Sequence, residues 1–241
     1  MTPSTRQRLR LIEIGALGPA NRHLVLEAVG RTSFSFEPGQ HLCLKKAFDG
    51  RSARRHFSIA SAPNGGNCVE LCVGVDTHSA FGRYLGRVGP GDEIEYEGPA
   101  GNFRLRKPLQ DSIFVAGGTG ISPIRSMLQH LIGGETDRSA RCELTLIYGA
   151  RHPEQIFYRE EFESLPRRRP NFQFWPTLSG PSHGWAGRSG YVQTHLAEVL
   201  RGRTHGVDVY LCGRRAMIEE ALQLLDDVGL DENSIIYEKY G

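Results

Sequence analysis

The chain has 241 residues, of which 39% are hydrophobic and 23% are charged, as in ordinary globular proteins. Its 29 lysine and arginine residues almost balance its 27 aspartate and glutamate residues, which excludes the strong positive charge typical of nucleic-acid-binding proteins. It contains neither a run of ~20 apolar residues that would span a membrane nor the apolar core of a signal peptide near its first residue. We therefore expect a cytoplasmic protein with no nucleic-acid partner and no membrane span.

The five cysteines are spread along the chain in an odd number, which fits reduced thiols in a cytoplasm. Cys68 and Cys72 lie on one expected strand, where four residues span roughly 13 Å, so they are too far apart to bind one metal ion. No group of four cysteines has the compact spacing of an iron–sulfur site. The sequence therefore predicts no metal site.

From residue 8 to about 106, short apolar segments are separated by turn residues at 38–39, 64–66 and 89–92. Several strands at such spacing predict a small antiparallel barrel or sandwich, with one short helix at 81–88. The expected strands are 9–14, 23–28, 41–44, 57–60, 69–75 and 93–97.

The pattern of expected elements changes after residues 107–108, where strands begin to alternate with helices. This pattern predicts a doubly wound parallel sheet with helices on both faces, and such sheets bind ligands at the carboxyl ends of their strands. We therefore expect two domains, a β-barrel at 1–107 and an α/β domain at 108–241. The expected strands are 113–116, 143–148, 172–177 and 208–211, and the expected helices are 123–132, 154–165, 192–200 and 216–228.

The segment 113–127 is the stretch around which the chain is organised. A buried strand is broken by Gly117, Gly118 and Gly120, and Ser122 with Pro123 then resembles a helix cap and first turn. Glycines allow a ligand to approach the backbone, and the N–H groups of a helix N-terminus favour a phosphate. The alternative is a tight corner without a ligand. The spacing differs from the common G-x-G-x-x-G dinucleotide fingerprint.

A second informative segment, 54–61, offers three kinds of contact. Arg55 suits a phosphate, Phe57 presents an aromatic face, and the Ser58 hydroxyl suits a polar ring edge. Such a set is able to hold a flavin nucleotide. From these residues alone, the favoured alternative is a strand end with Phe57 in the core and Arg55 on the surface.

Taken together, the motifs resemble the ferredoxin–NADP⁺ reductase family over nearly the whole chain, from about 7 to 240. That family joins a flavin-binding antiparallel β-barrel to an α/β domain that binds a pyridine nucleotide. Each motif is modest alone, and their order along the chain is what makes the resemblance specific. They are P-G-Q at 38–40, R-H-F-S at 55–58, E-G-P-A-G-N-F at 97–103, G-G-T-G-x-x-P at 117–123, Y-G-A-R at 148–151, G-W-A-G-R at 184–188, Y-L-C-G at 210–213 and Y-E-K-Y at 237–240.

On the barrel side, the resemblance implies an FAD site. Arg55 would bind the flavin phosphate, Phe57 would pack on the ring, and Ser58 would donate a hydrogen bond near the flavin N5 atom. The next strand would contribute backbone groups. The remaining residues implied on this side are His56, Cys72, Val73, Gly74, Phe81, Gly82 and Arg83.

On the α/β side, the resemblance implies a site for NADH or NADPH. Cys212 and Gly213 would place the nicotinamide beside the flavin, while Tyr240 and Glu238 would lie near the flavin face. With Ser58, the residues Cys212, Glu238 and Tyr240 form the implied catalytic set. The remaining residues implied for the nucleotide are Gly118, Thr119, Gly120, Ile121, Ser122, Arg151, Ser179 and Met217.

Three departures from the family pattern affect this interpretation. Phe57 replaces a usual tyrosine, and Gly82 replaces a common serine, which leaves only a backbone N–H for a phosphate. Ser179-Gly180 stands where NADP-using members often have Ser-Arg. The missing arginine favours NADH, although Arg151, His183 and Arg188 are possible substitutes.

The resemblance implies an FAD-dependent reductase that takes a hydride from the nicotinamide and passes single electrons to a separate ferredoxin, flavodoxin or oxygenase component. Two alternatives stay open. One is an NAD(P)H:flavin reductase that releases reduced flavin, because the R-x-F-S sequence resembles that subgroup's motif. The other is a nucleotide-binding regulatory subunit without activity.

Overall fold

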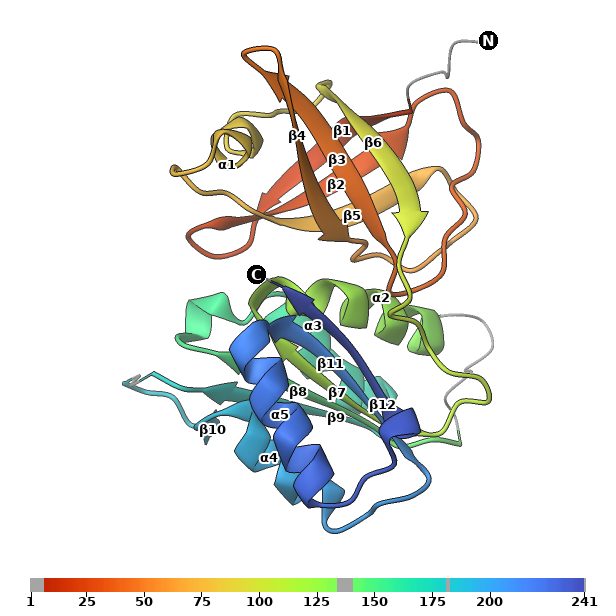
Figure 1. Ribbon diagram of the computed structural model, residues 1–241, viewed down its shortest axis with the longest axis vertical. Helices are drawn as coiled ribbons and strands as arrows, with labels where there is room; N and C mark the ends of the chain where they lie inside the picture. The colour runs from red at the N-terminus through yellow and green to blue at the C-terminus, as the bar shows by residue number, and fades with distance from the viewer. Residues whose placement is uncertain (1–6, 134–140, 181–182, 241) are drawn as a thin grey trace.

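The computed structural model describes residues 7–133, 141–180 and 183–240, and places two six-stranded sheets one above the other (Figure 1). The first sheet is antiparallel throughout and has the order β4-β3-β6-β1-β2-β5. A bridge between Ile59 and Leu71 joins its two ends, so the sheet curls into a barrel. Its strands are β1 (Arg8–Ala16), β2 (Asn21–Ala28), β3 (His41–Phe48), β4 (Arg51–Ser58), β5 (Cys68–Gly74) and β6 (Glu93–Ala100).

The barrel interior is built by strands whose alternate side chains are apolar. In β1, Leu9 and Leu11 are fully buried while the arginines beside them are exposed, which is the period of two expected for a strand with one wet face. The short helix α1 (Ala80–Leu85), capped by the Ser79 hydroxyl, adds Phe81 and Leu85 to the same core. The antiparallel barrel predicted from the sequence is therefore confirmed.

The second sheet is parallel throughout, in the order β10-β9-β8-β7-β11-β12. In its central strand β7, Phe114 packs toward helices α2 and α3, and Val115 packs toward α4 and α5. Helices on both faces confirm the predicted doubly wound architecture. The elements are β7 (Asp111–Gly117), α2 (Ile121–Ile132), β8 (Leu144–Ala150), α3 (Arg159–Arg168), β9 (Phe172–Leu178), β10 (Arg188–Ser189), α4 (Val192–Leu200), β11 (Val207–Arg214), α5 (Arg215–Asp227) and β12 (Ile235–Tyr240).

Two expected elements are displaced along the chain. The strand expected at 57–60 is β4, which ends at Ser58 and runs mainly through charged, exposed residues that carry no apolar pattern. The helix expected at 154–165 is divided. A 3₁₀ turn (Pro153–Gln155) comes first, and α3 begins only at Arg159 because Ile156 and Phe157 turn into the core and Tyr158 is left-handed, with φ 57°.

The start of α2 also differs from the expectation. The segment Gly118–Gly120 forms a 3₁₀ turn, and α2 follows with Gly120 as its N-cap residue. Ser122 is therefore inside the first turn and does not cap the helix. Strands β10 and β12 were not expected, since the first has two residues and the second carries charged and tyrosine side chains. The domain boundary at 107–108 lies between the end of β6 and the start of β7 and stays a prediction.

Backbone segments approach each other closely where β7 and β11 end. A Cβ atom on Gly120 would lie 2.1 Å from the Cys212 carbonyl oxygen, and one on Gly117 would lie 2.7 Å from the Met217 sulfur. At Gly120 only a residue without a side chain fits, because a carbonyl on a central strand has nowhere to move, whereas at Gly117 the flexible Met217 side chain would have to shift. Gly120 therefore holds the loop after β7 against the end of β11.

We expect Gly120→Ala to lower the free energy of unfolding by about 1–3 kcal/mol, because the added methyl group overpacks a rigid backbone contact. Urea unfolding followed by circular dichroism measures the change. Gly89→Ala is the matched control, since Gly89 has no atom within 4 Å of its would-be Cβ. Equal stability of the two variants would contradict the proposed packing constraint.

Candidate functional site

A cavity of about 520 Å³ lies where the barrel meets the parallel sheet, within the ~300–1,000 Å³ usual for small-molecule sites. One wall comes from β3, β4 and β5, and the other from the loop after β7 and the end of β12. It thus joins two regions that are far apart in the sequence. Its lining residues are His41, His56, Phe57, Ser58, Cys72, Gly74, Thr119, Ser122, Glu238, Lys239 and Tyr240.

The barrel wall is set by strand pairing. In the β3–β4 register, Ser58 lies opposite His41 and Phe57 lies opposite Leu42. Phe57 is half-buried and packs against Phe81, with ring centroids 6.4 Å apart. The cavity therefore has an aromatic side chain beside a hydroxyl group, which suits a planar ring with a polar edge.

A hydroxyl contact joins the two walls. The Ser58 and Tyr240 hydroxyl oxygens are 2.6 Å apart, and the other neighbour of the Tyr240 hydroxyl is the Cys212 thiol. Burial raises the pKa of both Tyr240 and Cys212 well above their ordinary values, so both stay protonated at neutral pH. Cys212 is thus linked through Tyr240 to Ser58, the neighbour of Phe57, although it does not itself line the cavity.

Three polar atoms at the cavity are buried without a hydrogen-bond partner among the described residues: His41 Nδ1, Ser122 Oγ and Glu238 Oε2. Buried polar groups in proteins are almost always satisfied, so such a cluster indicates a polar ligand. Together with Phe57, these atoms fit a flavin, which combines an aromatic ring system with donors and acceptors along its edge. The site also contains an opposed pair, because His41 Nδ1 lies 3.7 Å from Glu238 Oε1.

Burial weakens the charges of this pair. It lowers the pKa of His41, with a further contribution from the neighbouring His56, and raises the pKa of Glu238. Both shifts favour the uncharged forms. The Glu238 carboxyl therefore titrates closer to neutral pH than an exposed carboxyl would, the His41 imidazole titrates at lower pH than an exposed histidine would, and a ligand that binds there changes the environment of both.

Several residues expected at the site lie outside the cavity. Arg55 is exposed on β4, and the side chain of Val73 points into the barrel core with that of Phe81. The Gly82 N–H donates to Ser79 Oγ over 2.9 Å, so a phosphate would compete for it. The others that do not line the cavity are Arg83, Gly118, Gly120, Ile121, Arg151, Ser179, Cys212, Gly213 and Met217; their roles stay predictions.

Two lining residues were missed by the sequence interpretation, His41 and Lys239. His41 begins β3 directly after P-G-Q, and only the antiparallel register shows that it faces Ser58. Lys239 lies between two residues that were expected at the site. In the part of the chain that the structure describes, no group of three histidine, cysteine, aspartate or glutamate residues is arranged for a metal ion.

Comparisons with known proteins agree with this geometry. Residues 8–105 match the family model described as an oxidoreductase FAD-binding domain, and residues 114–223 match the one described as an oxidoreductase NAD-binding domain. The chain is 34% identical to ferredoxin–NADP reductase B of Sorangium cellulosum, and the match covers 96% of both chains. It is 32% identical to the phenol hydroxylase P5 protein of Acinetobacter pittii, covering 95% of this chain but only 64% of that protein.

Solved structures share the fold. A ferredoxin NADP⁺ reductase from Neisseria gonorrhoeae, with bound FAD and NADP, superposes with a TM-score of 0.83 at 18% identity and covers 98% of this chain and 99% of that one. The Amycolatopsis cytochrome P450 reductase GcoB superposes with a TM-score of 0.85 at 24% identity, covering 98% and 69%. Among the described residues, no helix has the length and apolar character needed to cross a membrane.

The raised pKa of Glu238 predicts that ionisation of this carboxyl lowers the stability of the fold. A carboxyl whose pKa is higher in the folded than in the unfolded protein stabilises the fold while protonated, and this stability is lost as the pH rises above its ordinary value of 4.5. We therefore expect Glu238→Gln to gain stability relative to the parent as the pH rises above about 4.5. Urea unfolding of flavin-free protein measures this, and a difference that does not vary with pH would contradict it.

Proposed function

Since the chain belongs to the ferredoxin–NADP⁺ reductase family of FAD- and nicotinamide-dependent oxidoreductases, we propose that its reduced flavin delivers electrons to a separate ferredoxin, flavodoxin or oxygenase component. The chain is an electron-transfer reductase that uses FAD and a nicotinamide dinucleotide donor. FAD, when bound, accepts a hydride from the nicotinamide and releases electrons singly. The observation that carries the site assignment is the 2.6 Å contact between Ser58 and Tyr240, which joins the barrel to the parallel sheet.

In this proposal, the barrel wall binds the flavin ring. Phe57 supplies the aromatic contact and Ser58 a hydroxyl for the polar edge, as the cavity geometry supports. Tyr240 covers the face that the nicotinamide must reach, with its hydroxyl held by Ser58. Cys212, fully buried at the carboxyl end of β11, limits how deeply a nicotinamide ring enters. These residues orient the two rings and exclude water from between them.

The loop after β7 binds the nucleotide's pyrophosphate. Gly118 adopts φ +56° with open space around its would-be Cβ, so a ligand has access to the backbone there. Thr119 and Ser122 line the cavity directly beyond it. The Ser122 hydroxyl, without a hydrogen-bond partner among described residues, is the polar group best placed to bind the donor.

We infer that NADH is the preferred donor. An arginine at position 180 is absent, and a Cβ atom there would lie 2.5 Å from the Arg151 carbonyl oxygen. Arg188 is engaged elsewhere, 3.4 Å from the Trp175 ring and in an ion pair with Glu198. Arg151, beside Gly180, and His183 are both exposed and are therefore the remaining candidates for binding a 2′-phosphate if NADPH is used.

The electron acceptor is proposed to be a separate protein. The chain spans 64% and 58% of two phenol hydroxylase reductase proteins, so those relatives contain further sequence beyond the matched region. The described residues of this chain include no arrangement for a metal cluster. A one-electron acceptor must therefore be supplied from outside the part of the chain that is described.

Gel filtration and visible absorbance of the purified protein test these proposals directly. We expect a yellow protein whose flavin co-elutes in gel filtration, and whose visible absorbance is bleached by NADH at lower concentration than by NADPH. Flavin that separates from the protein would favour the flavin-reductase alternative. Failure to oxidise either nucleotide with ferricyanide would contradict the reductase function.

We expect Arg55→Ala to lose flavin, because the guanidinium is the cation on β4 assigned to the flavin phosphate. Its affinity for FAD should fall about tenfold, as for the loss of one charge-assisted hydrogen bond. Fluorescence titration of flavin-free protein with FAD measures this. Arg51→Ala, an exposed arginine at the other end of β4, is the control and should bind FAD as the parent does.

We expect Cys212→Ala to slow flavin reduction by NADH by more than twofold, while FAD content stays at the parent level, because the thiol lies at the proposed nicotinamide position and not at the barrel wall. Stopped-flow absorbance at saturating nucleotide measures the rate. Cys142→Ala, a half-buried cysteine before β8, is the control. Equal rates in Cys212→Ala and the parent would remove Cys212 from the site.

A further inference from the structure

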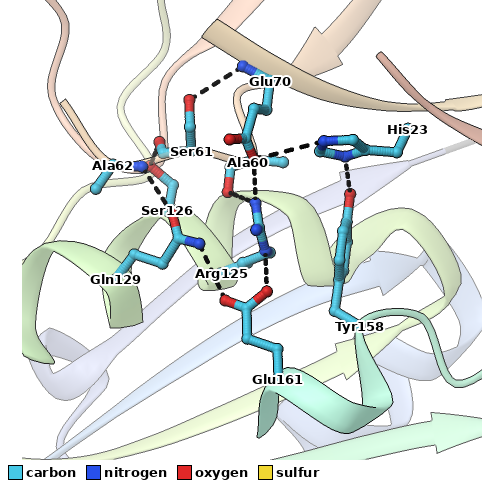
Figure 2. A network of polar contacts seen from close by, with 10 residues as sticks. All are labelled: His23, Ala60, Ser61, Ala62, Glu70, Arg125, Ser126, Gln129, Tyr158 and Glu161. Atoms are coloured by element: carbon cyan, nitrogen blue, oxygen red, sulfur yellow. Dashed lines mark hydrogen bonds and ion pairs between the residues drawn. The ribbon is translucent and has the colours of Figure 1, made fainter. Parts of the chain in front are cut away.

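Helix α2 contacts the barrel through a row of polar side chains, which we call the polar seam (Figure 2). Three of its side chains bind three successive barrel residues. Arg125 donates to the Ala60 carbonyl over 2.9 Å, Ser126 donates to the Ser61 carbonyl over 2.6 Å, and the Ala62 N–H donates to Gln129 Oε1 over 3.1 Å. Gln129 is four residues from Arg125 and three from Ser126, so the three side chains lie on one side of the helix and form a continuous set of contacts.

Arg125 is the centre of this seam. Its side chain is only 10% exposed, and it forms ion pairs with Glu70 on β5 at 2.5 Å and Glu161 on α3 at 2.7 Å. Burial alone would lower the pKa of Arg125, but these two carboxylates raise it, so the guanidinium stays charged. One cation thus binds a carboxylate of the barrel and a carboxylate of the α/β domain at the same time.

A second layer holds the two carboxylates and the guanidinium in place. Gln129 donates to Glu161 over 3.0 Å, and His23 on β2 lies 3.7 Å from Glu70. The ring of Tyr158 covers the Arg125 guanidinium at 4.4 Å, and its hydroxyl lies 3.0 Å from His23 Nδ1. The planar fork of an arginine fits this arrangement of oxygens and ring, whereas an ammonium group offers no such fork.

The seam lies a short distance along the chain from both halves of the candidate site. Ala60 follows Ser58 by two residues, and Arg125 follows the loop at Gly118–Gly120 by five. Fixing the segment after Ser58 against α2 therefore fixes the flavin wall against the nucleotide loop. Hydride transfer requires near-contact between two rings, so a displacement of ~1 Å is enough to slow it strongly.

We propose that Arg125 is a positioning residue that sets the relative placement of the two domains, and through it the alignment of nicotinamide and flavin. It touches neither ligand, and acts through Ala60 and the two carboxylates. This proposal rests on the function proposed above. The same role extends to Glu161, which holds Arg125 from the α/β side.

The first test is Arg125→Met, which keeps the length of the apolar stem but removes the cation. We expect FAD content to stay within about twofold of the parent, while flavin reduction by NADH slows about tenfold or more. The long-wavelength absorbance of the stacked nicotinamide–flavin complex should weaken in parallel. Small-angle X-ray scattering of flavin-free protein should give a larger radius of gyration. Arg125→Lys should restore only part of the rate, because the charge returns without the fork.

A milder pair of variants keeps the test valid if Arg125→Met does not fold. Glu161→Gln and Glu163→Gln make the same change two residues apart on α3, but the ion pair that the described residues give Glu163 is with exposed Arg159 one turn away. We expect slower flavin reduction in Glu161→Gln alone. A folded Arg125→Met with the parent's rate and absorbance, or equal rates in the two glutamine variants, would overturn the proposal. A parent protein that does not oxidise either nucleotide would contradict the function instead.

Discussion

The approach of two backbones, at the carboxyl ends of β7 and β11, is the constraint on which the candidate site depends. Gly120 lies so close to the Cys212 carbonyl that any side chain is excluded, and Met217 closes the same region over Gly117. The glycines of this loop therefore have two separate structural roles. Gly120 packs one loop on a neighbouring strand, whereas Gly118, left-handed and open, leaves backbone accessible to a ligand. The tight corner and the phosphate loop are then two parts of one structure.

The sequence predicted both domains because each has a periodic apolar pattern. Leu9 and Leu11 alternate with arginines, and 113–116 is apolar on both faces, so the strand type could be read directly. Charged strands at the edges of the sheets were harder to predict from the sequence. β4 carries arginines and a histidine, and β12 carries tyrosines and a lysine, so their position rests on pairing with neighbours that no local pattern reveals. His41 was missed for the same reason, since only the register places it opposite Ser58, which the R-H-F-S motif had indicated.

Three of the six side-chain polar atoms that are buried without a hydrogen-bond partner among the described residues lie at the cavity. Orphaned atoms at His41, Ser122 and Glu238 cost free energy in the isolated protein, since a buried polar group without a partner loses its hydration. Their position on both walls of one cavity indicates an environment prepared for a ligand's polar edge. Nearby, Arg125 has the opposite arrangement, because its Nε and one of its terminal nitrogens donate hydrogen bonds to three oxygens. A hydrogen-bonded polar seam beside a partly satisfied cavity separates the part of the interface that joins the domains from the part that binds.

The composition of β4 has a consequence beyond cofactor binding. This strand hydrogen-bonds with β3 on one side, and its remaining contact across the barrel is the bridge at Ile59 that follows it. An open strand edge is a template on which other chains aggregate. Arg51, Arg54 and Arg55 are exposed along it, so like charges would meet if two copies paired edge to edge. Arg55, which we propose binds a phosphate, therefore also lies where its charge would disfavour edge-to-edge pairing of two copies.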